Sequence, residues 1–240
     1  MANEKTNTDQ FVRRFIEEIG VAYEEQGSSN VQIKEALKNA SKSKNQTGVG
    51  KPEFIFFSDN HLIIIEDKLE LNKLEYKNED GQIDTEFPFR RDYAVNGAIH
   101  YAKHIIEKTN SYKEVIAIGV VGNGIHYQIQ PYYVSATDIK VLPELKNLED
   151  LSPENIGEFF KVAVLGELPK EERELREVNK IAAEMHEDLR NYGQLEGEKK
   201  ATVVSAILLA LEEPTFSLQQ LKGSDRVGST DGEIIFNAVR

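Results

Sequence analysis

The sequence contains no cysteine at all. Disulfides, thiolate nucleophiles and cysteine-ligated zinc sites are therefore excluded. Long apolar runs are also missing, because the longest nearly apolar stretch, Val203 to Leu211, is too short to cross a bilayer. The polar N-terminus, Met1 to Asp9, lacks the apolar core of a signal peptide. We therefore expect a soluble, cytoplasmic protein without a membrane partner.

Basic residues are in the minority, with 29 Lys and Arg against 41 Asp and Glu and a net charge of −12. Taken alone, this balance argues against a nucleic-acid-binding protein. The charge is unevenly spread, however. Residues 31–51 carry five lysines against one acid, whereas residues 144–198 carry fifteen acids against seven bases. The lysine run fits a solvated helix face, which is the default interpretation, or a surface that meets phosphates.

The pattern of apolar and turn-forming residues predicts helices, two hairpins and a helical tail. A first helix is expected to be capped by Thr8 or Asp9, and residues 69–91 are expected to order only with a partner. The other predicted elements are a helix from about Val31 to Lys42, a hairpin of residues 53–57 and 62–68, a helix over about 92–108, a hairpin of residues 115–121 and 125–130, and helices near 153–163, 169–191 and 197–212.

The charged residues of the first predicted hairpin give the most specific indication of function. A Ser58–His61 loop pairs Phe57 with Leu62, which places Glu53 opposite Glu66. Directly opposed like charges are destabilising. Lys68, two residues after Glu66, projects to the same face. Two carboxylates and an ammonium therefore converge on an otherwise apolar sheet.

A hard divalent cation would relieve this repulsion, because Mg²⁺ prefers carboxylate oxygens together with water and phosphate. Glu18 lies almost on the inner stripe of the first helix and is a further candidate ligand. A cation held there activates water and stabilises charge on a phosphodiester. The alternative interpretation is ordinary charge at a sheet edge, with Glu66 paired to Lys68.

Pro52-Glu53 followed by Glu66-Asp67-Lys68 resembles the PD-(D/E)xK nuclease signature, with Glu53 in place of the usual Asp. More narrowly, the chain resembles the N-terminal nuclease region of type I restriction subunits and of single-chain type IIG restriction–modification enzymes. Residues 52–55, 65–68, 94–103, 162–169 and 179–186 carry that similarity. The resemblance implies an α/β fold with an αβββαβ core and a mixed central sheet, followed by a helical C-terminal connector.

The resemblance also implies roles for individual residues. Glu53 and Glu66 would bind Mg²⁺ or Mn²⁺, the backbone carbonyl of Asp67 would be a further ligand, and Lys68 would be the catalytic lysine. Many relatives carry a Gln-x-x-x-Tyr helix beside the site, whereas this chain has Gly97 and Tyr101 at that spacing, with Asn96 as a possible substitute for the glutamine. The candidate DNA contacts are Lys42, Lys44, Lys51, Tyr101 and Lys103.

Type IIG enzymes also carry a methyltransferase with an Asn-Pro-Pro-Tyr motif and a glycine-rich S-adenosylmethionine loop, and neither motif occurs here. We therefore expect a nuclease domain over residues 1–145 and a helical connector over 146–240. The methyltransferase, with its S-adenosylmethionine, and the specificity region would lie in other parts of the same polypeptide. The glycine-rich stretch 223–232 is expected to be a surface connection.

The sequence thus predicts a Mg²⁺-dependent, site-specific endodeoxyribonuclease domain of a restriction–modification enzyme, which hydrolyses phosphodiesters of double-stranded DNA with metal-activated water. One alternative is a catalytically inactive DNA-binding or docking module with the same fold. Another is a nuclease of the same superfamily that acts on junctions or repair intermediates. The acidic helical tail, which resembles a restriction-enzyme connector, disfavours the last alternative.

Overall fold

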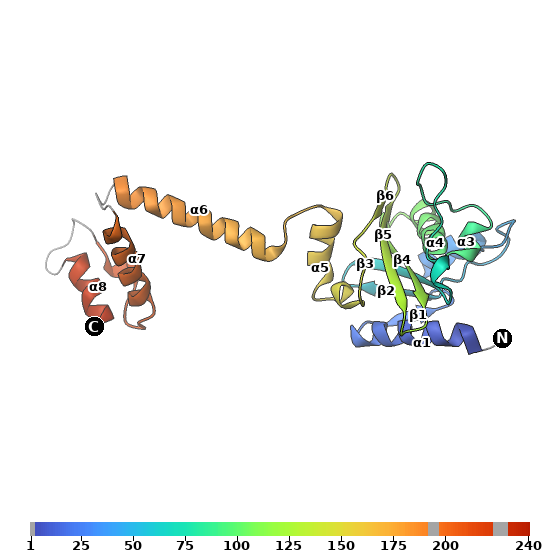
Figure 1. The fold of residues 1–240 in the computed structure, drawn as a ribbon, viewed down its shortest axis with the longest axis horizontal. Helices are drawn as coiled ribbons and strands as arrows, with labels where there is room; N and C mark the ends of the chain where they lie inside the picture. Colours follow the sequence, from blue (N-terminus) through green and yellow to red (C-terminus); the bar gives the residue numbers. More distant parts are fainter. Residues whose placement is uncertain (1–2, 192–196, 223–229) are drawn as a thin grey trace. The chain divides into compact units, whose positions relative to one another are not determined.

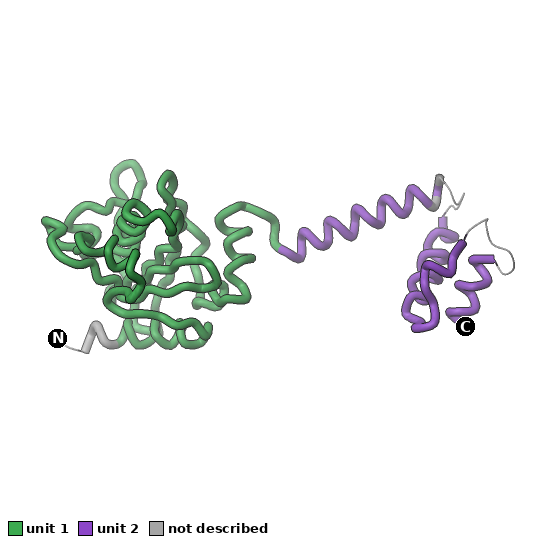
Figure 2. Tube along the Cα trace, turned by 180° about the vertical axis from the view of Figure 1, so that it is seen from behind, with its two compact units in different colours: residues 1–169 green, residues 170–240 purple. Residues whose placement is uncertain are grey.

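The computed structural model describes residues 3–191, 197–222 and 230–240, and the chain divides into two compact units, residues 1–169 and 170–240 (Figures 1 and 2). The domain boundary predicted from the sequence lies at residue 145. The segment that follows, however, buries Leu148, Leu151 and Ile156 in the core of the first unit. The compact unit therefore extends to Pro169.

The first unit combines one sheet with helices on both of its faces (Figure 1). Its elements are α1 (Asn3–Glu18), β1 (Tyr23–Glu25), α2 (Val31–Ala36), η1 (Leu37–Asn39), β2 (Phe54–Ser58), β3 (His61–Lys68), η2 (Leu71–Lys73), α3 (Phe89–Asp92), α4 (Ala94–Lys108), β4 (Glu114–Gly122), β5 (Tyr127–Ser135), β6 (Ile139–Val141), η3 (Glu149–Leu151), α5 (Ile156–Phe159) and the π-helical η4 (Phe160–Val164).

The six strands lie in the sheet in chain order, from β1 to β6. Only the β3–β4 pair is parallel, and α4 connects these two strands. All other neighbours are antiparallel, as expected for strands joined by short turns. The predicted α/β class with a mixed central sheet is therefore confirmed. The order α1, β1, β2, β3, α4, β4 matches the expected αβββαβ core, and β1 supplies its short first strand.

Both faces of β2 and β3 are buried, which explains why these strands are apolar at successive positions. On one face, Ile55 and Ile64 pack with α2 and α4 in one apolar cluster. On the other face, Phe54 and Ile65 pack with α1 in a second cluster. Side chains therefore alternate between an α4 side and an α1 side of the sheet.

Two helix boundaries differ from the prediction. The first helix begins at Asn3, so neither Thr8 nor Asp9 caps it, and the buried Thr8 hydroxyl instead donates to the Gly122 carbonyl at 2.7 Å. The second helix ends at Ala36 and continues only as the 3₁₀ turn η1, because the chain then leaves toward the sheet. The lysines beyond residue 39 consequently lie in a loop.

Residues 69–91 are folded without a partner, so the expectation that they order only on binding is wrong. The Tyr76 and Phe89 rings stack with centroids 3.7 Å apart. The buried Asn96 side chain receives the Tyr76 N–H at 2.9 Å and donates to the Asp84 carbonyl at 2.6 Å. The side-chain amide of Asn96 in α4 thus forms hydrogen bonds with the backbone of residues 69–91. Local sequence patterns do not reveal this long-range interaction.

The second unit is helical, as predicted. Its elements are α6 (Lys170–Asn191), α7 (Glu198–Leu211), η5 (Leu218–Gln220) and α8 (Asp231–Val239). The prediction missed α8, which begins with a capping box between Thr230 and Glu233. The expected surface connection over 223–232 lies largely outside the described residues. In the parts of the chain that the structure describes, no helix combines the length and apolarity needed to span a bilayer.

Candidate active site

The β2–β3 hairpin has the predicted register. Phe57 pairs with Leu62, and Phe54 pairs with Ile65. Ser58 and His61 also pair, so the turn is shorter than the four residues expected. Glu53 precedes β2 by one residue, and its backbone N–H donates to Glu66 Oε1 at 3.2 Å. The hairpin therefore brings these two glutamates together.

The alternation of the strands directs Glu53, Glu66 and Lys68 to the α4 side of the sheet. Glu66 is fully buried and Glu53 is 7% exposed. The Lys68 ammonium donates to the Asp67 carbonyl at 3.0 Å, which brings a cation to the oxygen expected to be a metal ligand. All the groups of the predicted constellation thus lie at one end of the hairpin.

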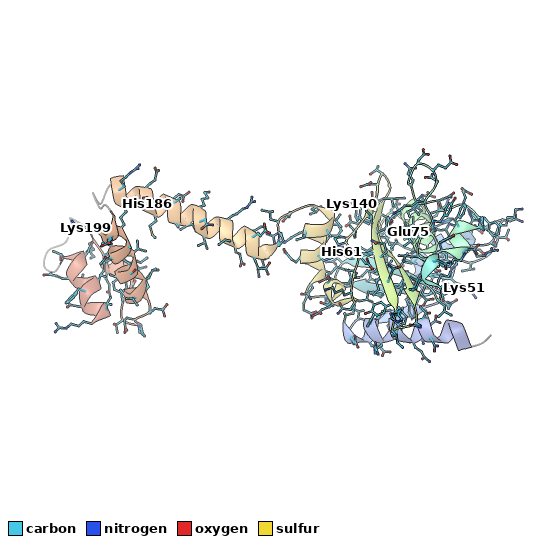
Figure 3. All side chains as sticks on the ribbon, viewed as in Figure 1. Lys51, His61, Glu75, Lys140, His186 and Lys199 are labelled. Carbon is cyan, nitrogen blue, oxygen red and sulfur yellow. The ribbon has the colours of Figure 1, made fainter. Side chains whose placement is uncertain are left out.

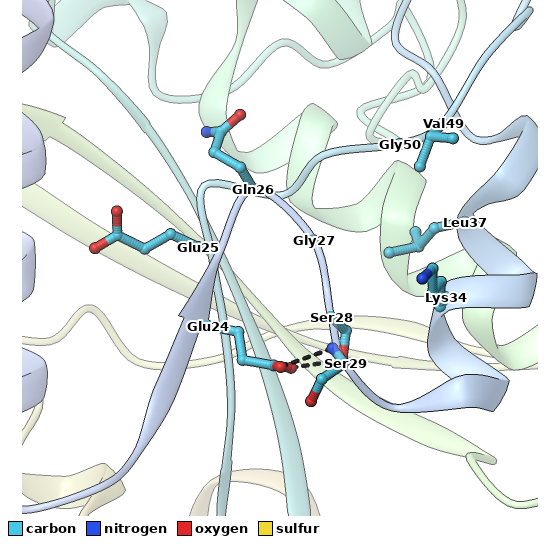
Figure 4. A pocket seen from close by; sticks show the side chains of 10 residues that line it. All are labelled: Glu24, Glu25, Gln26, Gly27, Ser28, Ser29, Lys34, Leu37, Val49 and Gly50. Atoms are coloured by element: carbon cyan, nitrogen blue, oxygen red, sulfur yellow. Dashed lines mark hydrogen bonds between the residues drawn. The ribbon is translucent and has the colours of Figure 1, made fainter.

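Two further side chains satisfy the carboxylates. The ammonium of Lys42 pairs with Glu66 Oε2, and the side-chain amide of Gln26 donates to Glu53 Oε2. Gln26 lies at the end of β1, where it lines a surface pocket of about 350 Å³ (Figure 4), and its φ of 55° is unusual for a residue other than glycine. Lys42 was predicted to contact DNA, and Gln26 was not predicted to belong to the site.

Helix α4 approaches the carboxylates closely because two glycines leave room for it. A Cβ at Gly97 would lie 2.9 Å from the Arg90 carbonyl oxygen and 3.3 Å from Glu66 Oε2. Gly119, which pairs with Glu66 across β3 and β4, would place a Cβ 2.5 Å from Val95 Cγ2. No glutamine fits at Gly97, and Asn96 does not replace it, since Asn96 binds residues 76 and 84.

Tyr101 is buried beside the carboxylates, with 1% of its surface exposed, so the expectation that it contacts DNA is wrong. Its hydroxyl accepts the Lys51 N–H at 3.1 Å, and its ring lies 5.5 Å from the Lys42 ammonium. Burial, reinforced by the negative charge of Glu66, raises the pKa of the Tyr101 hydroxyl. Tyr101 therefore stays neutral and holds the chain that leads into Glu53.

The other candidate DNA contacts separate into two places. Lys44 and Lys51 have exposed side chains on the first unit (Figure 3 labels Lys51). Lys103 is half-buried and lines a groove of about 740 Å³ that contains none of the three catalytic candidates. Lys44 and Lys51 are therefore the candidate DNA contacts that lie close in sequence to Glu53, whereas Lys103 lies elsewhere.

Glu18 does not lie on the inner face of α1. Its side chain is 58% exposed and faces Arg14, with Oε1 3.5 Å from the guanidinium Nε. The buried stripe is centred on Val12 and Ile16 rather than on Phe11, which rotates Glu18 toward solvent. The acid that α1 contributes is Asp9, three residues before Val12 on the same stripe.

Asp9 influences Asp67, whose side chain points to the α1 side. Burial raises the pKa of Asp67 to about 8, and the carboxylates of Asp9 and Glu53 contribute in the same direction. The shift favours the protonated form of the Asp67 carboxyl, which can share a hydrogen bond with Asp9. The helical spacing of Asp9, Val12 and Ile16 was the signal that could have identified this acid.

The donor set matches a hard cation in its chemistry, because two carboxylates and a backbone carbonyl lie at one end of the hairpin, where helix α4 leaves no room for a side chain at Gly97. Ammonium groups already contact Glu66 Oε2 and the Asp67 carbonyl, so these oxygens attract positive charge. Within the described ranges, no three His, Asp or Glu side chains form a group that could hold a metal by themselves. Water or phosphate oxygens would have to complete the coordination shell.

Comparison with known proteins gives an extensive match. The chain is 83% identical over all of its 240 residues to the type II restriction enzyme and methyltransferase RM.BcgI of Heyndrickxia coagulans. It spans 38% of the length of that curated relative. No protein-family model matches the chain, and no solved structure does. The similarity therefore connects the chain with one part of a restriction–modification protein.

Proposed function

We propose that this chain is the nuclease part of a restriction–modification enzyme and that it hydrolyses double-stranded DNA with Mg²⁺ or Mn²⁺. The observation that carries the proposal is the convergence of Glu53, Glu66 and Lys68 at the end of the β2–β3 hairpin. The relative's name, a restriction enzyme and methyltransferase, supports the same class of function. The PD-(D/E)xK assignment, the type IIG class and a cytoplasmic location are parts of this proposal.

Glu53 and Glu66 would hold the divalent cation together with the Asp67 carbonyl. A cation bound there makes water a stronger nucleophile and stabilises the charge that builds up on the phosphodiester. In the reaction, the water oxygen bonds to phosphorus and the P–O3′ bond breaks. Water loses a proton, the 3′-oxygen gains one, and a 5′-phosphate remains.

Lys68 would position the attacking water or a phosphate oxygen. Its ammonium reaches the Asp67 carbonyl and so lies beside the proposed ligands, on the face that Glu66 shares. The buried surroundings of Glu66 strengthen each electrostatic interaction because they exclude water. Lys44 and Lys51, which are exposed, would contact the DNA backbone near this site.

The remaining activities would lie in other parts of the polypeptide. The relative is more than twice as long as this chain and is named as a methyltransferase as well as a restriction enzyme. We propose that methylation with S-adenosylmethionine and recognition of the target sequence belong to such parts. The helical second unit would connect the nuclease to them.

The test is Mg²⁺-dependent nicking of supercoiled DNA by this chain and by a longer polypeptide that contains it. The variant Lys68→Met should lose nicking in both proteins, because no other ammonium contacts the Asp67 carbonyl among the described interactions. Lys108→Met is the matched control, since Lys108 is exposed at the end of α4. Equal nicking by Lys68→Met and the wild type would refute the assigned role of Lys68.

A catalytically inactive docking module with the same fold is the second candidate. It is favoured by Lys42 and Gln26, which already satisfy one oxygen of Glu66 and one oxygen of Glu53. The two candidates differ in cation binding. Titration with Mn²⁺ in the presence of duplex DNA separates them, because only the nuclease requires the cation at these carboxylates.

A further inference from the structure

We propose that Lys42 is a resident counter-cation of the metal site, which holds Glu66 in the metal-free protein and is displaced when a divalent cation binds. This inference rests on the proposed function, because it concerns the same carboxylates. It adds a residue and a competition that the Glu53–Glu66–Lys68 constellation does not contain. It also predicts that DNA and metal bind cooperatively.

The contact between Lys42 and Glu66 is enclosed. The Lys42 side chain is 17% exposed and the Glu66 side chain is fully buried, although Lys42 comes from a loop that is otherwise rich in exposed polar residues. The Lys42 ammonium also lies 5.5 Å from the centre of the Tyr101 ring. A lysine that served only as a solvated surface charge would leave its ammonium in water.

The loop that delivers Lys42 is anchored on both sides of it. On one side, His100 Nε2 lies 3.0 Å from the Ala40 carbonyl oxygen. On the other side, the buried Arg90 guanidinium donates to the Ser43 carbonyl at 2.7 Å. Because both neighbouring segments are held from α3 and α4, the direction of Lys42 is set by the fold and not by the ion pair alone.

The geometry leaves few open directions around Glu66. Its Oε1 accepts the Glu53 N–H, and the α4 backbone at Gly97 covers the carboxylate so closely that a Cβ there would lie 3.3 Å from Oε2. The Lys42 ammonium contacts the other oxygen, Oε2. Mg²⁺ binds a carboxylate oxygen at about 2.0–2.1 Å. Such a cation and the ammonium would therefore compete for the same oxygen.

Displacement also explains how DNA could assist the metal. Once it has left Glu66, Lys42 remains on an anchored loop whose neighbour Lys44 is exposed. A DNA phosphate offers the released ammonium a new partner. DNA would thus favour the state in which Glu66 is available to the cation, and linkage requires the cation to strengthen DNA binding equally.

The first experiment is calorimetric titration of Mn²⁺ into the wild type, Lys42→Met and the matched control Lys108→Met, whose lysine is exposed at the end of α4. Lys42→Met should bind Mn²⁺ about 10-fold more tightly than the wild type, within the usual range for coupled ligands, whereas Lys108→Met should not differ. Duplex DNA should tighten Mn²⁺ binding by the wild type and have much less effect on Lys42→Met. Equal or weaker binding by a folded Lys42→Met would overturn the proposal.

Removing Lys42 leaves the Glu66 charge buried, so the variant could fail to fold. The second experiment therefore uses the wild type: the ¹⁵N resonance of the Lys42 ammonium, assigned with the charge-conserving Lys42→Arg, is followed during Mg²⁺ titration. We expect a slowly exchanging ammonium signal that disappears at saturation and returns with a chelator. A signal that persists at saturation, with metal bound, overturns only this proposal. If neither the wild type nor Lys42→Met binds metal, with or without DNA, the proposed function is overturned as well.

Discussion

Replacement of Gly119 by alanine should destabilise the first unit, because helix α4 packs directly on this glycine. The new Cβ would lie 2.5 Å from Val95 Cγ2 and 2.6 Å from the Val95 backbone nitrogen. Neither atom can yield without moving the start of α4, since Val95 is fully buried. Overpacking of this kind costs about 1–3 kcal/mol. The lower freedom of alanine in the unfolded chain returns about 0.5–1 kcal/mol.

The net loss of unfolding free energy should therefore be about 1–2 kcal/mol. For a urea m-value of about 2 kcal/mol/M, the unfolding midpoint would fall by roughly 0.5–1 M. Tyrosine fluorescence is the appropriate signal, because the chain has no tryptophan and every tyrosine except Tyr192 lies in the first unit.

Gly157→Ala is the matched control for this measurement. A Cβ at Gly157 meets nothing within 4 Å, and the residue lies in α5. Its replacement should leave stability unchanged or raise it by up to about 1 kcal/mol through helix propensity. If Gly119→Ala kept the wild-type midpoint, α4 would not lie against β4 beside Glu66 as described.

Three other variants test the surroundings of the site. Burial lowers the pKa of His100 to about 3, so below pH 6.5 the unfolded chain takes up a proton that the folded chain lacks. The free energy of unfolding should therefore fall by up to about 1.4 kcal/mol per pH unit as the pH drops from 6.5 to 3. His100→Asn should lose this part of the slope in urea titrations at several pH values, and exposed His126→Asn should keep it. Tyr101→Phe should cost about 1–2 kcal/mol because it strips the Lys51 N–H of its acceptor, and a loss equal to that of the exposed-pair control Tyr133→Phe would refute this. Arg90→Met should lower the free energy of unfolding by about 2–4 kcal/mol and accelerate tryptic cleavage after Lys44, because two loop carbonyls lose their hydrogen-bond donor. An unchanged cleavage rate would contradict the anchoring of the loop.

Much of the hairpin could be predicted from the sequence because its determinants are local. The turn residues between Phe57 and Leu62 set the register, and the register places Glu53 beside Glu66. The period of two then places Lys68 on the same face. A strand as short as Tyr23–Glu25 gives no such periodic signal, so it could not be assigned.

The surroundings of the carboxylates could not be predicted, because they depend on contacts between distant segments. Lys42 and Glu66 are 24 residues apart, and Gln26 and Glu53 are 27 apart. In the sequence, Lys42 is one of several lysines in a basic run, and only the fold distinguishes it from Lys44. Asp9 is a different case, because its helical spacing from Val12 is visible in the sequence. The buried stripe of the first helix was predicted to centre on Phe11, however, and Asp9 was therefore not identified.

Glu66 is proposed to belong to a divalent-cation site of a nuclease. The most direct test is calorimetric titration of Mn²⁺, with duplex DNA present, into the wild type, Glu66→Gln and the control Glu18→Gln, with circular dichroism to establish that each is folded. We predict binding by the wild type and by Glu18→Gln, whose replaced side chain is exposed, and no binding by Glu66→Gln. Equal binding by all three proteins, or no binding by the wild type, would contradict the account.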